Sequence, residues 1–261
     1  MALTLIDGNN RLRALFEKAG PNALQMFFFK SISHTPDHKT IWVWDGENGT
    51  ASRKAQFPDY KGQSKNAPTD AFWETMNFFK QLLQHSNCFQ IEVPGYEADD
   101  VIATLAKGSS EYIEIDSSDA DFHSLICDRI TLTKEHTIEP EFIRLYKVLV
   151  GDKSDNISGI KGFGEAMWAN LQHSERRLLI KHFEGKEILT ADDVVEMCGF
   201  KPAAAKFWAE QQALLQTFWN IVGFIDVPLE IIQQNLKAGV LNHQAAQEML
   251  RSQFLSLGAI A

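Results

Sequence analysis

Leu5-Ile6-Asp7-Gly8-Asn9, near the N-terminus, places a carboxylate directly after an apolar run. Trp42-Val43-Trp44-Asp45-Gly46 repeats the arrangement after an expected helical stretch from about Arg11 to Ser33. Apolar runs of this length are typical of buried parallel strands. Because the carboxyl ends of parallel strands gather along one edge of a sheet, we expect acids from distant parts of the sequence to meet there.

Three further acidic clusters fall where a strand would end or a helix would begin. Glu97-Ala98-Asp99-Asp100 opens an expected helix over residues 97–107, with Glu97 and Asp100 on one helical face. A helix start favours one or two acids, but three acids in four residues repel one another, which favours a binding site. The other clusters are Ser117-Ser118-Asp119-Ala120-Asp121, which alone fits a helix cap equally well, and Asp152 with Asp155.

Converging carboxylates cannot all stay ionised side by side without cations. Hard oxygen ligands without His or Cys partners select Mg²⁺, for which Mn²⁺ can substitute. The sequence therefore predicts a metal-dependent enzyme that acts on phosphates. The nine candidate ligands are Asp7, Asp45, Glu97, Asp99, Asp100, Asp119, Asp121, Asp152 and Asp155. Asp116, just before the fourth cluster, is interpreted as a solvated acid at a strand end.

The stretch from Gly151 to Gly164 is the most specific, because two acids at i and i+3 precede a glycine-rich hairpin. Closely spaced glycines let backbone amides and carbonyls approach a phosphate or a bound ion directly. A polar segment over residues 50–66 is expected to be a loop, since Pro and Gly interrupt it. Its basic and aromatic residues suit phosphates and stacked bases, although taken alone it fits a solvated basic loop better. Arg11 and Arg13 either grip a terminal phosphate or are surface charges of a helix.

Composition narrows the class of protein. The formal net charge is −9, but removing the nine clustered acids from the 34 Asp and Glu leaves 25, which equals the 25 Lys and Arg. Acidity therefore does not exclude DNA as a partner. No apolar stretch approaches the roughly 18 residues of a membrane helix, and the N-terminus lacks the features of a signal peptide. Cys88, Cys127 and Cys198 form no pairs by spacing, which indicates thiols in a reducing cytoplasm.

The order of expected elements favours an α/β fold. Strands are expected at residues 3–7, 41–45, 89–93 and 112–116, with a helix from about Asp70 to His85 between them. After about Tyr146 the pattern changes to helices with aromatic core residues. We therefore expect an α/β domain over residues 1–147 and a helical domain over residues 148–261.

Taken together, these motifs resemble the 5′-nuclease family of flap endonucleases, phage 5′→3′ exonucleases and the 5′-nuclease domain of bacterial DNA polymerase I. The resemblance covers residues 3–166, and a free-standing phage-type enzyme is the nearest likeness. The matching stretches are Leu5 to Asn9, Trp44-Asp45-Gly46, Arg53 with Phe57 to Gly62, Glu97 to Asp100, Ser117 to Phe122, and Gly151 to Gly164.

The resemblance implies a PIN-like, mostly parallel sheet flanked by helices, followed by a helical region with a helix–three-turn–helix element that grips duplex DNA. It implies a structure-dependent 5′→3′ exonuclease or flap endonuclease with a two-metal mechanism. Its partners would be DNA with 5′ flaps, nicks or duplex 5′ ends, and RNA–DNA primers. The implied setting is phage DNA replication in the host cytoplasm, by a monomer that needs no membrane.

The resemblance also implies roles for individual residues. All nine acids match metal ligands, and Tyr60 and Lys61 match an active-site tyrosine and lysine, with Arg53 as a third catalytic candidate. The ion nearest the chemistry would be held by Asp7, Asp45, Glu97, Asp99 and Asp119, the second by Asp121, Asp152 and Asp155, and Asp100 could serve either. K⁺ would bind carbonyls in the hairpin, at Ile157, Ile160 and Phe163. The expected DNA contacts are Arg11, Lys54, Lys65, Lys153, Lys161, Gly162 and Gly164.

The sequence departs from the family pattern at three places. Ala120 and Ala166 replace basic residues that many relatives carry, so a weaker grip on duplex DNA, or reliance on Lys161, is expected. Little chain separates Lys61 from the helix near Asp70, too little for a long arch that threads flaps. Two rivals stay open. A single-strand-specific PIN-type ribonuclease would need fewer acids and no hairpin, and a catalytically silent DNA-junction binding protein would lack some acids.

Overall fold

The computed structural model describes residues 2–20, 38–62, 68–134 and 137–258. Contacts divide the chain into two compact units. Unit 1 comprises Met1–Gly49, Asn66–Glu135 and Ile225–Ala261, and unit 2 comprises Thr50–Lys65 and His136–Phe224. The division into domains at residues 147 and 148 stays a prediction.

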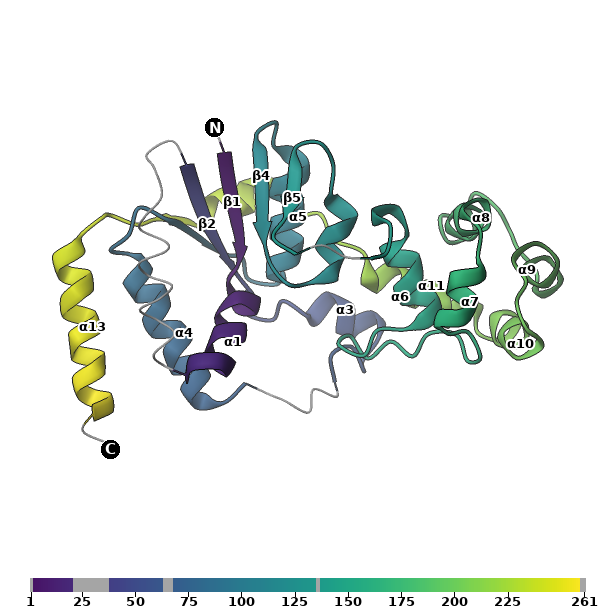
Figure 1. Ribbon diagram of the computed structural model, residues 1–261, viewed down its shortest axis with the longest axis horizontal. Coiled ribbons are helices and arrows are strands. Elements are labelled where there is room, and N and C mark those ends of the chain that lie inside the picture. The colour runs from purple at the N-terminus through teal and green to yellow at the C-terminus, as the bar shows by residue number, and fades with distance from the viewer. Residues whose placement is uncertain (1, 21–37, 63–67, 135–136, 259–261) are drawn as a thin grey trace. The chain divides into compact units, whose positions relative to one another are not determined.

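Unit 1 is built on a six-stranded sheet with the strand order β5-β4-β1-β2-β3-β6, part of which is visible in Figure 1. Five strands are parallel to one another: β1 (Ala2–Asp7), β2 (His38–Trp44), β3 (Phe89–Glu92), β4 (Tyr112–Asp116) and β5 (Ile130–Leu132). The sixth, β6 (Leu236–Ala238), runs antiparallel to β3. The expected mostly parallel α/β sheet is therefore confirmed.

The central strands are buried because helices cover the sheet. Leu5, Trp42 and Val43 are fully buried, as expected for continuous apolar runs in parallel strands. One core cluster joins Trp42 and side chains of α1 (Gly8–Ala19), α4 (Asp70–Leu83) and α13 (His243–Gly258). Outside this cluster, α5 (Ala98–Gly108) packs against β1 and β2. The helices thus stabilise the sheet, in which Asp7 and Asp45 stand at the carboxyl ends of β1 and β2.

Unit 2 is helical. Where the structure describes it, its elements are α3 (Ala51–Gln56), η3 (Pro140–Phe142), α6 (Ile143–Val150), α7 (Glu165–Asn170), α8 (His173–Phe183), α9 (Ala191–Cys198), α10 (Pro202–Glu210) and α11 (Gln212–Val222). Trp208 and Phe218 are fully buried in a core that the helices share. The helical character of this part agrees with the expected helical region after the sheet.

The glycine-rich hairpin connects α6 to α7. Gly151 ends α6 with a φ of 106°, and its N–H donates to the Lys147 carbonyl over 3.0 Å. Asp152 and Ile157 then exchange two backbone hydrogen bonds of 2.9 and 2.8 Å. At Gly159, with a φ of 67°, a Cβ would lie 2.5 Å from the Val150 carbonyl carbon. A larger residue there would force the hairpin away from the end of α6.

Two expectations about secondary structure were wrong. Residues 50–66 were expected to be a loop, but Ala51–Gln56 form α3. This helix is held by a long-range contact, since the buried Arg53 donates to the Ile221 carbonyl. The part after Tyr146 was expected to be helical throughout, but β6 adds a strand to the edge of β3. All residues of β6 are exposed, so no hydrophobic alternation marks it in the sequence.

The remaining elements in the described part of unit 1 are the short helices η2 (Ala120–Leu125) and α12 (Leu229–Gln234). Within the described part of the chain, no helix combines the length and the apolar character needed to cross a membrane.

Candidate active site

Asp7 stands at the carboxyl end of the central strand β1 and also caps α1. Its Oδ1 accepts a hydrogen bond from the Asn10 N–H over 3.1 Å, and its Oδ2 accepts one from Ser117 Oγ over 2.9 Å. Burial, together with the charges of Asp45 and Asp119, raises the pKa of Asp7 to about 7 despite these bonds. The expected convergence of acids from β1, β2 and the end of β4 is therefore present.

Asp45 links the end of β2 to the start of α5. Its Oδ1 accepts a hydrogen bond from the Ala98 N–H over 2.9 Å, and its own N–H donates to Asn9 Oδ1 over 3.1 Å. Gly46 makes this approach possible, because a Cβ there would lie 1.8 Å from the Val93 carbonyl oxygen. The Asp-Gly pair thus brings a second strand-end acid beside the cluster that begins at Glu97.

Glu97, Asp99 and Asp100 form a compact cluster, in which one carboxylate oxygen of each lies within 4.8 Å of the others. Glu97 is 3% exposed and Asp100 is fully buried, while Asp99 is partly exposed. Asp100 Oδ1 accepts a hydrogen bond of 2.8 Å from the Ile225 N–H. Asp100 therefore also anchors the chain where it re-enters unit 1.

Ser117 connects the fourth cluster to Asp7. Its hydroxyl donates to Asp7 and accepts a hydrogen bond of 3.1 Å from the Asp119 N–H. Asp119 then caps the short helix η2, since its Oδ1 accepts from the Asp121 N–H over 2.9 Å. The motif serves both as a cap and as part of the acidic site, so the two interpretations of the sequence are compatible.

Asp116 and Arg11 lie beside this site. Arg11 Nε lies 3.0 Å from Asp116 Oδ1, which also accepts a hydrogen bond from Thr133 Oγ1. The role of Arg11 in holding a terminal phosphate stays a prediction, and a phosphate there would compete with Asp116. Arg13 forms a surface ion pair of 3.1 Å with Glu17.

Asp152 and Asp155, the remaining candidate ligands, belong to unit 2. Asp152 Oδ2 lies 2.6 Å from Lys147 Nζ, and its Oδ1 accepts a hydrogen bond from the Ser154 N–H over 2.8 Å. Asp155 is 7% exposed. Lys147 was not among the expected site residues, because no motif marks a buried lysine within a helix. Whether the two acids join those of the sheet in holding ions stays a prediction.

The three expected catalytic residues also lie in unit 2. Tyr60 is 2% exposed and part of the core, whereas Lys61 is exposed, with its Nζ 5.2 Å from the centre of the Tyr60 ring. Arg53 is buried; its Nε donates to the Ile221 carbonyl over 2.9 Å and its Nη2 to the Gly223 carbonyl over 3.1 Å. Arg53 is thus committed to the end of α11, and any direct part in catalysis stays a prediction.

Most of the residues expected to contact DNA or K⁺ lie in the part of the chain that the structure describes. Lys54, Lys153, Lys161, Gly162 and Gly164 are exposed. Lys65 lies outside the described residues. Two of the carbonyls expected to bind K⁺ already accept hydrogen bonds, at Ile157 from the Asp152 N–H and at Ile160 from the Phe163 N–H. Since a carbonyl oxygen has two lone pairs, these bonds are compatible with a bound ion.

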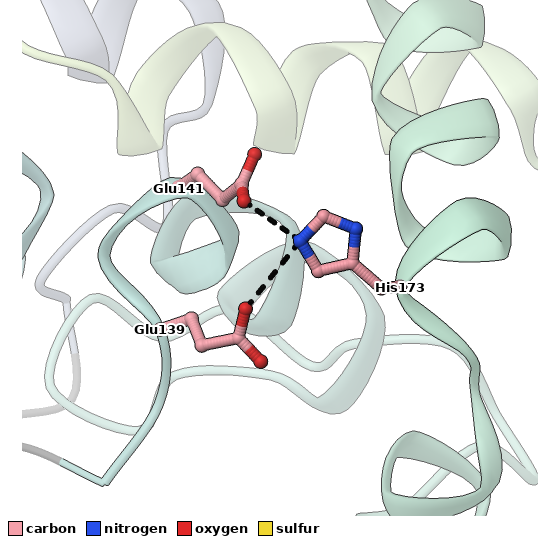
Figure 2. Close-up of side chains that lie close together, drawn as sticks. All are labelled: Glu139, Glu141 and His173. Carbon is pink, nitrogen blue, oxygen red and sulfur yellow. Dashed lines mark hydrogen bonds and ion pairs between the residues drawn. The ribbon is translucent and has the colours of Figure 1, made fainter.

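Figure 2 shows a second group with potential metal ligands, which no motif in the sequence marks. His173 Nε2 lies 3.0 Å from Glu141 Oε1 and 3.6 Å from Glu139 Oε2, and all three side chains are exposed. Arg176 and Arg177 also pair with these carboxylates. The arginines already balance the negative charge, so we interpret the group as an ion-pair network between η3 and α8.

The sequence profile described as "5'-3' exonuclease, N-terminal resolvase-like domain" matches residues 3–148, more than half of the chain. The chain belongs to the 5′→3′ exonuclease family. The expected 5′-nuclease resemblance is therefore confirmed.

Relatives of this 5′→3′ exonuclease family member include DNA polymerases and a 5′-3′ exonuclease. Thermostable DNA polymerase I of Thermus thermophilus is 33% identical over 144 residues, which are 49% of this chain and 17% of the relative. The 5′-3′ exonuclease of Aquifex aeolicus is 34% identical over 165 residues, which are 57% of this chain and 56% of the relative. The chain thus spans less than two thirds of either relative.

Solved structures show the same fold. The bacteriophage T5 5′-exonuclease with bound zinc has a TM-score of 0.61 at 17% identity and covers 96% of this chain and 99% of that chain. A flap endonuclease of the same phage, in a complex with DNA and metal ions, has a TM-score of 0.56 at 18% identity and covers 85% of this chain and 89% of that chain. The expected PIN-like nuclease fold is confirmed by these matches.

Proposed function

We propose that this protein is a divalent-metal-dependent 5′→3′ exonuclease and flap endonuclease that hydrolyses phosphodiesters of DNA. The observation that carries the proposal is the convergence of strand-end acids around Asp7. Burial and the neighbouring charges of Asp45 and Asp119 raise the pKa of Asp7 to about 7. Crowded carboxylates at this density are costly unless cations neutralise them. Membership of the family and the shared fold with a phage nuclease support the same conclusion.

The donor set fits Mg²⁺ or Mn²⁺. The ligands are carboxylate oxygens, three of which lie within 4.8 Å of one another at Glu97, Asp99 and Asp100. A divalent ion held there would lower the pKa of a bound water and so supply the nucleophile. In this proposal Asp7, Asp45, Glu97, Asp99 and Asp119 would hold the ion nearest the chemistry, Asp121, Asp152 and Asp155 would hold a second, and Asp100 would serve one of the two.

The chain's own groups would orient and neutralise the substrate. Lys61 would stabilise negative charge on the scissile phosphate, and the buried Tyr60 ring would limit where its ammonium can lie. The exposed Lys153 and Lys161 lie within the hairpin whose carbonyls would hold K⁺ against a DNA phosphate. Removal of RNA primers and action as a monomer in phage replication belong to the same proposal.

Cleavage assays test the proposal directly. Purified protein would be incubated with 5′-labelled flap, nicked and single-stranded DNA, and with single-stranded RNA, in Mg²⁺ and in EDTA. We expect Mg²⁺-dependent products from flap and nicked DNA. Binding without cleavage in Mg²⁺ and Mn²⁺ would contradict the proposal, and cleavage confined to RNA would favour the ribonuclease rival.

A further inference from the structure

Two turns of unit 2 that lie far apart in the sequence are joined by a pair of hydrogen bonds. Asn156 Nδ2 donates to the Asp59 carbonyl over 2.9 Å. The Lys61 N–H donates to the Asp155 carbonyl over 3.3 Å. The two bonds run in opposite directions, so the turn that carries Lys61 and the turn that carries Asp155 hold each other at two points.

The backbone at both turns has an unusual conformation. Lys61 and Asn156 have φ angles of 52° and 61°, in the left-handed region. Asparagine tolerates this region, whereas lysine adopts it rarely and only where the surrounding structure holds it there. The Asp59 carbonyl also accepts the Gly62 N–H over 2.9 Å, so hydrogen bonds to Asp59 and Asp155 fix the backbone around Lys61.

We propose that Asn156 is a positioning residue, which places Lys61 relative to Asp155 through the Asp59 carbonyl. The inference rests on the proposed function, in which Lys61 neutralises the scissile phosphate and Asp155 contributes to the second ion site. The proposed role of Asn156 acts through its bond to the Asp59 carbonyl and requires no contact with substrate or ion. A displacement of about 1 Å in a catalytic group can cost about 10²-fold in rate, so this placement affects catalysis.

The 152–157 turn does not need the hydrogen bond from the Asn156 side chain in order to fold. Asp152 and Ile157 close that turn with two backbone hydrogen bonds, and Ser154 donates to the Asp152 carboxylate. Neither contact involves the Asn156 side chain. Loss of the Asn156 amide should therefore leave the 152–157 turn folded and release mainly the turn that carries Lys61.

A simpler explanation is that asparagine occurs here only because it tolerates a positive φ. Asn156→Gly separates the two explanations, since glycine adopts the same φ without strain but lacks the amide. Asn156→Asp keeps the shape of the side chain but leaves no donor toward the Asp59 carbonyl when ionised. Asn48→Gly is the matched control, because Asn48 has a φ of 59° and lies in an exposed turn of unit 1.

Single-turnover cleavage of a 5′-flap substrate at saturating enzyme measures the effect. We expect Asn156→Gly and Asn156→Asp to lower the rate about 10-fold or more, with the Kd for DNA in Ca²⁺ changed by less than about 2-fold. Asn48→Gly should match the wild-type protein. A rate for Asn156→Gly within about 2-fold of wild type would overturn the proposal.

A double-mutant cycle with Lys61→Ala tests whether Asn156 acts through Lys61. Once the lysine side chain is absent, Asn156→Gly should slow cleavage by less than a further factor of about 2. If the two losses instead multiply, Asn156 acts independently of Lys61 and the proposal is wrong.

Amide hydrogen exchange gives a readout that does not depend on activity. The Lys61 N–H should exchange faster in Asn156→Gly, while the Ile157 N–H stays protected and the Tm stays close to that of the wild-type protein. Unchanged exchange at Lys61 would overturn the inference even if the protein proved not to be a nuclease. Absence of cleavage by the wild-type protein would overturn only the proposed function.

Discussion

Lys147 Nζ lies 2.6 Å from Asp152 Oδ2, and both side chains are close to fully buried, at 10% and 12% exposure. Burial alone would raise the pKa of the Asp152 carboxyl. The ammonium of Lys147 and the hydrogen bonds from Ser154 outweigh burial and hold this pKa below its usual value. Asp152 therefore has a positive partner within unit 2 even when no metal ion is bound.

Lys147→Met should destabilise the protein by about 3 kcal/mol, because it leaves a buried carboxylate without its counter-charge. Chemical denaturation at neutral pH measures the loss. Lys186→Met is the control, since Lys186 pairs with Glu184 on the surface, with side chains that are 66% and 38% exposed. The loss of such an exposed pair should cost less than about 1 kcal/mol. If the two variants lost the same unfolding free energy, burial would not make the Lys147–Asp152 pair more important to stability than the exposed pair.

The same variant has an expected pH dependence. Because the folded-state pKa of Asp152 is lowered, its contribution to stability is present above the unfolded value of 3.8 and is lost as the pH falls through the folded value. The difference in unfolding free energy between wild type and Lys147→Met should therefore shrink as the pH falls below about 4. A difference that is constant from neutral to acidic pH would show that the charge pair is not its source.

The acids of unit 1 could be predicted because each follows a signal that is local in the sequence. Asp7 and Asp45 end apolar runs, and in a parallel sheet such ends must meet at one edge. Glu97 and its neighbours were marked by their mutual repulsion, which a helix start does not explain. The fold class followed from the same alternation of strands and helices.

Other features depend on contacts that no local pattern encodes. Lys147 lies in an ordinary amphipathic helix, and only the turn after Gly151 brings Asp152 back to it. Arg53 was expected in a polar loop as a catalytic candidate, but its guanidinium donates to carbonyls of residues 221 and 223, which are distant in the sequence. The edge strand β6 is exposed throughout and shows no hydrophobic periodicity. It forms a strand because it pairs with β3.

Metal binding should release protons near neutral pH. Burial and the charges of Asp45 and Asp119 raise the pKa of Asp7 to about 7, so the Asp7 carboxyl of the metal-free protein is partly protonated near neutral pH. Since a ligand must be deprotonated, Mg²⁺ affinity should rise with pH up to about 7 and then level off. Calorimetry in buffers of different ionisation enthalpy measures the proton release. Asp7→Asn should abolish that release, and a release that persists in Asp7→Asn would assign it to another group.

The raised pKa of Asp7 also has a consequence for the stability of the metal-free protein. An acid whose folded-state pKa lies above its unfolded value of 3.8 favours the folded state in its protonated form. Asp7 should therefore lower stability progressively as the pH rises from about 4 to about 7. In EDTA, Asp7→Asn should remove this part of the pH dependence, which thermal unfolding across that range would measure.

Asp99→Asn should abolish cleavage and leave the fold intact. It removes one charge from a cluster in which carboxylate oxygens lie within 4.8 Å, with almost no change in shape. Without metal, the Tm should hold or rise because the remaining acids repel less. Asp70→Asn, in the exposed first turn of α4, is the control and should keep full activity. Wild-type rates in Asp99→Asn would remove this cluster from the metal site.

Salt should weaken DNA binding steeply although the protein is acidic. Exposed lysines at 54, 153 and 161, with the amides of the hairpin, would engage about three to six phosphates, which predicts a log–log slope of roughly −3 to −5. Titrations in Ca²⁺ measure binding without cleavage. Lys161→Ala should reduce the magnitude of the slope by about 0.9 if its ammonium contacts one phosphate. A slope near zero for the wild-type protein would contradict an electrostatic interface at these residues.

Lys61→Ala should cost more in catalysis than in binding. The Lys61 backbone lies in the left-handed region, and its Nζ lies 5.2 Å from the centre of the buried Tyr60 ring. An interaction that strengthens only in the transition state lowers the rate of the chemical step and leaves ground-state affinity nearly intact. Losing one such contact typically costs about 10²-fold. Single-turnover cleavage at saturating enzyme measures that step.

Lys54→Ala provides the comparison for Lys61, because Lys54 is exposed on the neighbouring helix α3 and carries the same charge. As an ordinary phosphate contact, it should weaken DNA binding modestly and leave the single-turnover rate at saturation unchanged. Both variants lose one positive charge, but Lys61→Ala should lower mainly the single-turnover rate, whereas Lys54→Ala should lower only the affinity for DNA. If Lys61→Ala matched wild type in single-turnover rate and differed only in affinity, Lys61 would be a tether for DNA, with no part in stabilising the transition state.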